Sequence, residues 1–143
     1  MTADEPPLAL LLLRAARWFD RQVIAALEQQ GWPRLTPAQT LVFAHLDPGG
    51  TPPSELARRL GATRQATADQ VRVLERLGLL TVDGDPARAR GRLVRLTPRG
   101  RALADQAREV LDALEGSLPP STVDTLRRRL LALDLPTVPL GTS

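Results

Sequence analysis

Apolar residues recur at steps of three and four positions over most of the chain, which is the spacing of one face of an α-helix. The first such run extends from Leu8 to about Gln30 and is ended by Gly31. Its apolar positions are Leu12, Ala16, Phe19, Val23 and Leu27. The second run begins at Thr36-Pro37, a capping hydroxyl followed by the residue favoured at the first helical position, and reaches about Leu46.

Two short helical runs follow the break "DPGGTPP". The first spans Ser54 to Leu60, and the link after it is Gly61-Ala62. Thr63 caps the second run, which reaches about Leu77 and is ended by Gly78. Its inner face comprises Thr67, Val71, Leu74 and Leu77. Two short helices joined by a turn that contains glycine are typical of a helix-turn-helix.

After Gly78 the apolar period changes from that of a helix to the alternation of a strand. Leu80 and Val82 alternate with polar residues, and on the return Val94 and Leu96 alternate with Leu93 and Arg95. Two half-buried strands joined by a loop of roughly eight residues predict a β-hairpin. A β-hairpin that directly follows a helix-turn-helix is typical of a winged helix.

The last part of the chain returns to helical spacing. Thr97-Pro98 caps a long amphipathic helix that continues to about Glu115. Ser121 with Asp124 resembles a capping box for a final helix that ends near Asp134.

These elements predict a mainly α fold with a small β-hairpin wing, in which a winged helix-turn-helix is combined with a helical dimerisation region. We expect a single domain over residues 1–143. Within it, residues 36–97 form the winged helix-turn-helix, and residues 8–31 and 99–134 form the dimerisation region.

Dimerisation is expected because the terminal helices carry more apolar surface than one chain can use. Leu8 to Leu13 is apolar nearly all round, and leucines repeat at four- and three-residue steps in the last helix. We expect a two-fold interface built from Leu8, Leu11, Leu12, Leu126, Leu130 and Leu133. The alternative is that these leucines pack within a single-chain core.

Composition excludes several classes of function. The chain has no cysteine, which removes disulfides, thiolate metal sites and thiol redox sensing, and His45 is its one histidine. No Gly-rich phosphate loop and no pair of carboxylates beside a base is present, so we expect no enzyme, no cofactor and no metal. The longest apolar run is far below the ~18 residues of a membrane span. We therefore expect a cytoplasmic protein that does not bind a membrane.

The positive charge is concentrated in one segment. All 19 basic residues are arginine, and residues 55–101 hold 11 of them against five acids, a local net charge of +6. The rest of the chain has a net charge of −3. This asymmetry is typical of a surface that binds a polyanion, although a GC-rich genome alone can raise the arginine content.

The outer face of the second short helix suits the major groove of DNA, because it is polar apart from the small Ala68. Arg64 and Gln65 lie at its N-terminal end, where they can approach bases or phosphates. Asp69 can position Arg72 as an i+3 neighbour or accept a hydrogen bond from cytosine. The predicted contact set is Thr63, Arg64, Gln65, Ala68, Asp69 and Arg72.

The hairpin and the preceding helix supply the remaining candidate DNA contacts. We expect Arg88, Arg90 and Arg92 to reach phosphates or a narrow minor groove, against the alternative of a solvated arginine-rich loop. Arg95 can contact DNA or pair with Asp83 across the strands. Backbone contacts by Arg58 and Arg59 compete with a solvated helix face.

The segments "LTPAQ", "SELARRLG", "TRQAT…VLERLGL" and "DP…RLVRLTPRGR" stand in an order and at a spacing that closely resemble the MarR family of bacterial transcriptional regulators. The resemblance spans roughly residues 8–134. It implies a homodimer with intertwined terminal helices and two winged helices that meet successive grooves of double-stranded DNA at a near-palindromic operator. It also implies control of a nearby promoter, for which we expect repression, relieved by a small aromatic or phenolic ligand.

The same resemblance places a ligand pocket between the dimerisation region and the winged helix. Candidate lining residues there are Arg14, Arg17, Trp18, Trp32, Phe43 and His45; for the aromatic ones a core position is the alternative. At the wing tip, family members commonly carry an acid followed by two arginines, whereas this chain has Arg88-Ala89-Arg90. Asp83 or Asp85 therefore has to replace the missing acid.

The alternative function is that of a protein-interaction module. A winged helix can bind an acidic protein partner in place of DNA. The arginine-rich loop and the polar outer face of the second short helix favour phosphates and base edges over such a partner.

Overall fold

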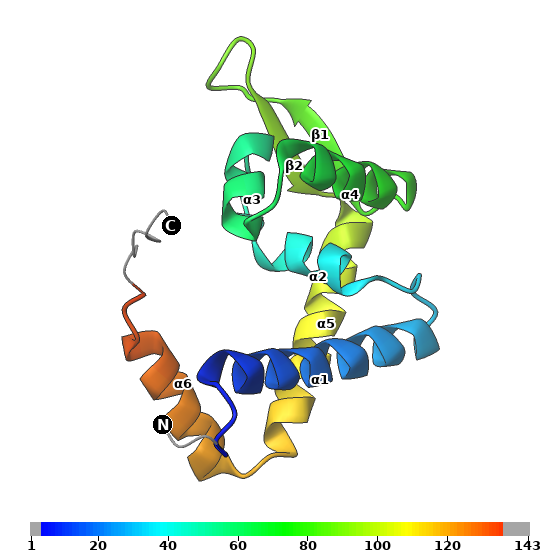
Figure 1. Ribbon diagram of the computed structural model, residues 1–143. Helices are drawn as coiled ribbons and strands as arrows, with labels where there is room; N and C mark the ends of the chain where they lie inside the picture. The colour runs from blue at the N-terminus through cyan, green and yellow to red at the C-terminus, as the bar shows by residue number, and fades with distance from the viewer. Residues whose placement is uncertain (1–3, 136–143) are drawn as a thin grey trace. The chain divides into compact units, whose positions relative to one another are not determined.

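The computed structural model describes residues 4–135 of the chain. In order along the chain, the elements are α1 (Leu8–Gln29), α2 (Pro37–Ala44), α3 (Pro53–Leu60), α4 (Arg64–Arg76), β1 (Leu80–Gly84), β2 (Arg92–Leu96), α5 (Pro98–Gly116) and α6 (Pro120–Ala132) (Figure 1). The predicted fold class is confirmed: the structure is mainly α-helical with one antiparallel hairpin. The chain divides within α5, between Leu111 and Asp112, into two compact units. No helix in residues 4–135 is both long enough and apolar enough to cross a membrane.

Leucines from most elements of the first unit form its core. The fully buried large side chains are Leu27, Val42, Leu56, Leu74, Leu79, Leu80, Val94 and Leu103. In α4, Thr67, Val71 and Leu74 face this core as predicted, and Leu77 is half-buried at the C-cap. The buried face of α4 therefore packs the helix-turn-helix against the core, and the opposite face of α4 remains exposed.

The predicted N-terminal caps are present at α2 and α4 and absent at α6. Thr36 and Gln39 form a reciprocal capping box at α2, and the Thr63 hydroxyl accepts from the Ala66 N–H at α4. The capping box expected at Ser121 and Asp124 is wrong. Helix α6 begins at Pro120, two residues before the start that a Ser121 cap requires, with Pro119 at the N-cap and no side-chain cap. Proline is favoured at the first helical position because it has no N–H to satisfy and its φ angle already suits the first turn.

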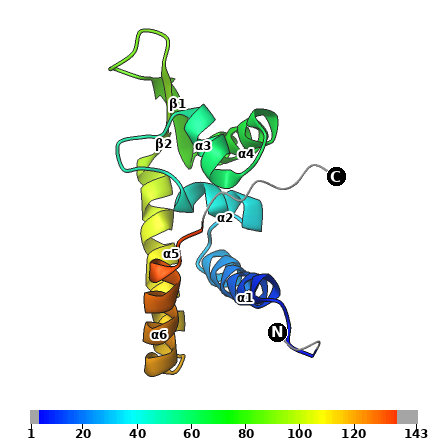
Figure 2. The same cartoon turned by 60° about the vertical axis from the view of Figure 1, so that its left-hand side comes forward.

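The hairpin is bonded on both edges of β2. Strands β1 and β2 pair with Leu80 opposite Leu96 and Val82 opposite Val94. On the other edge, Thr51 exchanges two backbone hydrogen bonds with Val94, of 2.8 and 3.0 Å. The seven-residue loop 85–91 projects away from the helices of this unit in both views (Figures 1 and 2).

The expected alternation along β2 fails at Leu93. Leu93 and Val94 are consecutive, yet both are buried. The chain just before α3 covers the second face of the strand, since a Cβ atom placed on Gly50 would lie 3.2 Å from the Leu93 Cβ. Leu93 therefore belongs to the core and not to an exposed face.

The start of α5 is fixed tightly against the turn between α4 and β1. The Thr97 N–H donates to the Leu79 carbonyl (3.0 Å), and the Thr97 hydroxyl donates to the Gly78 carbonyl (2.6 Å). At this approach a Cβ atom on Gly100 would lie 2.0 Å from the Leu79 carbonyl oxygen. Only glycine fits there without moving the backbone.

We therefore expect Gly100→Ala to lower the free energy of unfolding by roughly 2–3 kcal/mol, the cost of overpacking a rigid site. Chemical denaturation at a fixed protein concentration measures this. Gly116→Ala is the matched control, because no atom lies within 4 Å of its added methyl group. It should be neutral or stabilising by less than about 1 kcal/mol. Equal effects of the two substitutions would contradict the close contact at Gly100.

Candidate nucleic-acid interface

Helix α4 presents an exposed polar face opposite its buried one. Arg64, Gln65, Asp69 and Arg72 are exposed, and Ala68 is half-buried between them. Asp69 accepts hydrogen bonds from the Gln65 amide (3.0 Å) and from the Arg72 guanidinium. The ion pair expected between Asp69 and Arg72 therefore forms, and Asp69 also holds Gln65. Arg64 has no side-chain partner within residues 4–135.

A groove joins this face to the hairpin. It has a volume of about 310 Å³ and lies between α4 and the strands. Ala68 and Arg72 line it from α4, and Arg92 lines it from β2. The predicted recognition face and the base of the wing thus border one continuous surface of the same compact unit.

The wing tip is ordered by Asp85. Its carboxylate accepts from the Ala87 N–H (2.9 Å), its own N–H donates to the Gly91 carbonyl (2.8 Å), and its carbonyl accepts from the Arg88 N–H (3.1 Å). Asp85 therefore organises the backbone of the loop and not a guanidinium group. Arg88 and Arg90 are exposed, and neither has a side-chain partner in the described part of the chain.

The expected alternative for Arg95, a pair with Asp83, is wrong. The register places Arg95 opposite Thr81 and Asp83 opposite Leu93. Asp83 instead accepts from the Thr81 hydroxyl (3.0 Å). The Arg95 side chain lies against Gly50, where its Nε is buried without a hydrogen-bond partner. Arg95 is therefore turned toward the body of the unit.

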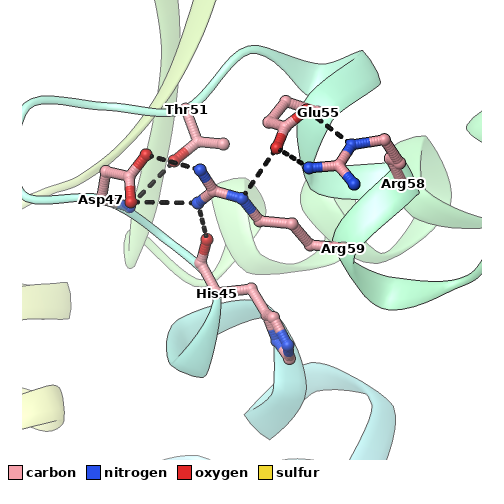
Figure 3. A network of polar contacts seen from close by, with 6 residues as sticks. All are labelled: His45, Asp47, Thr51, Glu55, Arg58 and Arg59. Carbon is pink, nitrogen blue, oxygen red and sulfur yellow. Dashed lines mark hydrogen bonds and ion pairs between the residues drawn. The ribbon is translucent and has the colours of Figure 1, made fainter. Parts of the chain in front are cut away.

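The two arginines of α3 have different surroundings (Figure 3). Among residues 4–135, Glu55 is the one side-chain partner of Arg58, whose side chain is 73% exposed. Arg59, at 28% exposure, bonds to Glu55, to both carboxylate oxygens of Asp47 and to the His45 carbonyl. Hydrogen bonds from Arg58 and Arg59 lower the pKa of Glu55 to about 2. Of the two predicted backbone contacts, Arg58 is the more exposed, whereas Arg59 is half-buried, and no sequence pattern had indicated the roles of Asp47 and Glu55.

A pocket of about 370 Å³ lies between α1, α2 and α5 within the first unit. Phe43 lines it, whereas Arg14, Arg17, Trp18 and His45 do not. Trp18 packs edge-on against Phe19, and Trp32 donates to Gln106 (2.6 Å) beneath the Arg99 guanidinium. The polar groups at the pocket are instead those of Asp20, Thr40 and Arg108. No sequence motif marks them, because they come together from three separate helices.

This arrangement can be compared with known proteins. The sequence model of the MarR family matches residues 35–91. The HTH-type transcriptional repressor Rv2887 of Mycobacterium tuberculosis is 34% identical over 114 residues, which cover 79% of this chain and 80% of the repressor. The structure of Rv2887 in complex with salicylic acid matches with a TM-score of 0.66 and 32% identity, over 93% of this chain and all of that one.

A second relative is CouR from Rhodococcus jostii. Its structure bound to p-coumaroyl-CoA matches with a TM-score of 0.69 and 26% identity, over 92% of this chain and 94% of that one. A structure of the repressor CouR bound to a 23-mer DNA duplex matches with a TM-score of 0.68 and 27% identity, over 88% and 91% of the two chains. The chain has the helix-turn-helix and the wing of these proteins, and the matches extend over most of its length. It therefore belongs to the MarR family of transcriptional regulators.

Proposed function

We propose that this protein represses transcription by binding, as a homodimer, to a near-palindromic site on double-stranded DNA. The observation that carries the proposal is the single surface that the polar face of α4 forms with Arg92 at the base of the wing, beyond which Arg88 and Arg90 are exposed on the loop. In this proposal residues 36–97 bind DNA, and residues 8–31 and 99–134 form the dimer. The DNA-bound structure of CouR and the repressor Rv2887 support it by similarity.

Each part of the surface has a role in the proposal. Helix α4 enters the major groove, where Arg64 and Gln65 approach base edges and Asp69 orients Arg72. Arg88 and Arg90 reach phosphates or the minor groove from the wing, since no acid in the described chain neutralises them. Arg92 and the exposed Arg58 add phosphate contacts.

A dimer would cover apolar side chains that are exposed to solvent within residues 4–135. Leu8, Leu11 and Leu12 at the start of α1 are 60%, 46% and 37% exposed. Helix α6 has no buried residue, and its Leu126, Leu130 and Leu133 are 45–55% exposed. Burial against a second copy would remove this surface from water.

A small aromatic ligand would relieve repression in this proposal. The pocket between α1, α2 and α5 has largely apolar walls, with Phe43 as the aromatic wall and Arg108 as a cation at its edge. These groups suit an aromatic carboxylate or a phenol. Rv2887 with salicylic acid and CouR with p-coumaroyl-CoA are relatives whose structures contain such ligands.

The proposal is tested by fluorescence anisotropy with the duplex upstream of the protein's own gene and a scrambled duplex, at several salt concentrations. We expect saturable binding of two protomers to the upstream duplex and a much weaker scrambled control. Absence of binding to any duplex at low salt would contradict the proposal. It would favour the alternative, a winged helix that binds an acidic protein.

Arg90→Ala should weaken binding to both duplexes, because interactions with phosphates carry no sequence information. The slope of log K against log salt should become shallower by about 0.9 for each phosphate that the variant no longer neutralises. Arg129→Ala removes the same charge from α6 and is expected to leave the slope unchanged. An unaltered affinity of the Arg90 variant would exclude the wing from the interface.

Gln65→Ala should instead change sequence preference. Removing a hydrogen bond to a base edge costs about 1–3 kcal/mol at the matching base pair only. Titrations against a set of single-base-pair variants of the upstream duplex measure this. A uniform decrease in affinity over all of these duplexes would contradict a base-reading role for Gln65.

Leu130→Glu should convert the dimer to monomers, because it places a charge in the apolar stripe of α6. Size-exclusion chromatography with light scattering gives the mass directly. Arg128→Glu introduces the same side chain two residues away, off the stripe, and should remain dimeric. Two variants of equal, dimeric mass would show that the α6 stripe lies outside the interface.

A further inference from the structure

Arg59 differs from Arg58, its neighbour on α3, because its guanidinium is turned inward and bonds to the chain that precedes the helix. Its Nη1 donates to the His45 carbonyl (2.9 Å) and to Asp47 Oδ1 (3.0 Å), and its Nη2 donates to Asp47 Oδ2 (2.9 Å). Its Nε donates to Glu55 (3.1 Å). Four of the five N–H donors of an arginine are therefore used within the protein.

Local charge also makes Arg59 unsuited to a phosphate. The carboxylates of Asp47 and Glu55 both lie within 3.1 Å of its guanidinium nitrogens, so its charge is already paired with two acids, of which Glu55 is shared with Arg58. The hydrogen bond from Arg59 lowers the pKa of Asp47, and that carboxylate stays ionised at neutral pH. An incoming phosphate would have to displace these carboxylates from the Arg59 guanidinium or approach close to them, and they would repel it.

The groups that Arg59 holds belong to the segment His45–Thr51, which leads to the edge of the wing. The Asp47 N–H donates to the Thr51 hydroxyl (2.9 Å), and the Gly50 N–H donates to the Asp47 carbonyl (3.0 Å). Thr51 then pairs with Val94 of β2 through both backbone hydrogen bonds. A continuous series of hydrogen bonds thus runs from α3 through Asp47 to Thr51 (Figure 3), and from Thr51 to β2.

The packing of Gly50 shows how closely this segment fits the strand. Gly50 has φ +101°, and a Cβ atom there would lie 2.9 Å from Arg95 Cγ and 3.2 Å from Leu93 Cβ. A displacement of the segment would therefore be transmitted to β2. Because the ends of β1 and β2 carry Arg88 and Arg90 on their connecting loop, the position of β2 sets where these guanidinium groups lie.

We propose that Arg59 is a positioning residue for DNA binding: it touches no phosphate, and by holding His45 and Asp47 it fixes the wing relative to the helix-turn-helix. This inference rests on the proposed function, since it concerns how the wing meets DNA. Arg58 provides the matched comparison. It lies on the same helix, bonds to the same Glu55, and makes no hydrogen bond with the segment His45–Thr51.

A double-mutant cycle tests the proposal with Arg59→Gln, Arg90→Ala, their combination, and the same set built on Arg58→Gln. Each variant is titrated with the upstream duplex at several salt concentrations. The loss of affinity caused by Arg90→Ala should be smaller, by on the order of threefold or more, in the Arg59→Gln background, because coupled residues are not additive. In the Arg58→Gln background the loss of affinity should equal that in the wild type.

Hydrogen exchange of the free protein supplies a readout that needs no DNA. Exchange of the Thr51 and Val94 amides should accelerate in Arg59→Gln and in the milder Asp47→Asn, and not in Arg58→Gln. The Leu27 amide in α1 should keep its wild-type rate, which separates a local change from general loss of stability.

Three results would be informative against the proposal, and they can be told apart. An equal loss of affinity from Arg90→Ala in all backgrounds, or unchanged exchange at Thr51 and Val94, would overturn the positioning role. A salt slope that becomes shallower by about 0.9 per protomer in Arg59→Gln alone would show that Arg59 binds a phosphate directly. If Arg90→Ala has no effect in the wild type, the proposed wing contact fails, and the exchange rates still decide the role of Arg59.

Discussion

The backbone pairing of Thr51 with Val94 is the constraint on which the arrangement of the winged helix-turn-helix depends. A two-stranded hairpin by itself is only marginally stable in water. Here β2 is bonded to β1 on one edge and to Thr51 on the other, and Thr51 lies only two residues before α3. The pairing therefore attaches the hairpin to the helix-turn-helix through the backbone. It also holds the preceding residue, Gly50, against Leu93, so that Leu93 and Val94 are both buried although they point to opposite faces of the strand.

Acidic residues decide which arginines of the basic segment remain available to a polyanion. Glu55 and Asp47 engage the arginines of α3, and Asp69 engages Arg72. The tip arginines have no such partner in residues 4–135. Exposed ion pairs contribute little to stability, so the consequence of this distribution is mainly electrostatic. The unpaired charges keep their long-range attraction for DNA, whereas the paired ones act over short distances through their geometry.

Helices and strands could be predicted from the sequence because they depend on neighbouring residues. Features that depend on contacts between distant residues could not be predicted. Thr36-Pro37 and Thr63 marked helix starts because capping depends on residues within one turn. The bridge from Thr51 to Val94 joins residues 43 positions apart in an otherwise irregular segment, and no period reveals it. The same reason applies to Arg59, whose partner Asp47 is 12 residues away, and to the pocket formed by three helices. In the sequence "ARRLG", nothing distinguishes the arginine that faces solvent from the one that faces inward.

The end of α2 connects the two sites that the proposals invoke. Leu41, Phe43 and Ala44 line the pocket, and His45, the next residue, offers its carbonyl to Arg59. A ligand that fits the pocket without moving this turn would bind without affecting DNA affinity, because only a difference in affinity between two conformers shifts their populations. A ligand that favours a displaced α2 would withdraw one of the acceptors that hold Arg59, and through Asp47 and Thr51 would alter the support of β2. If the proposed ligand acts on DNA binding through this connection, it has to displace the last turn of α2, and occupancy of the pocket alone would be insufficient.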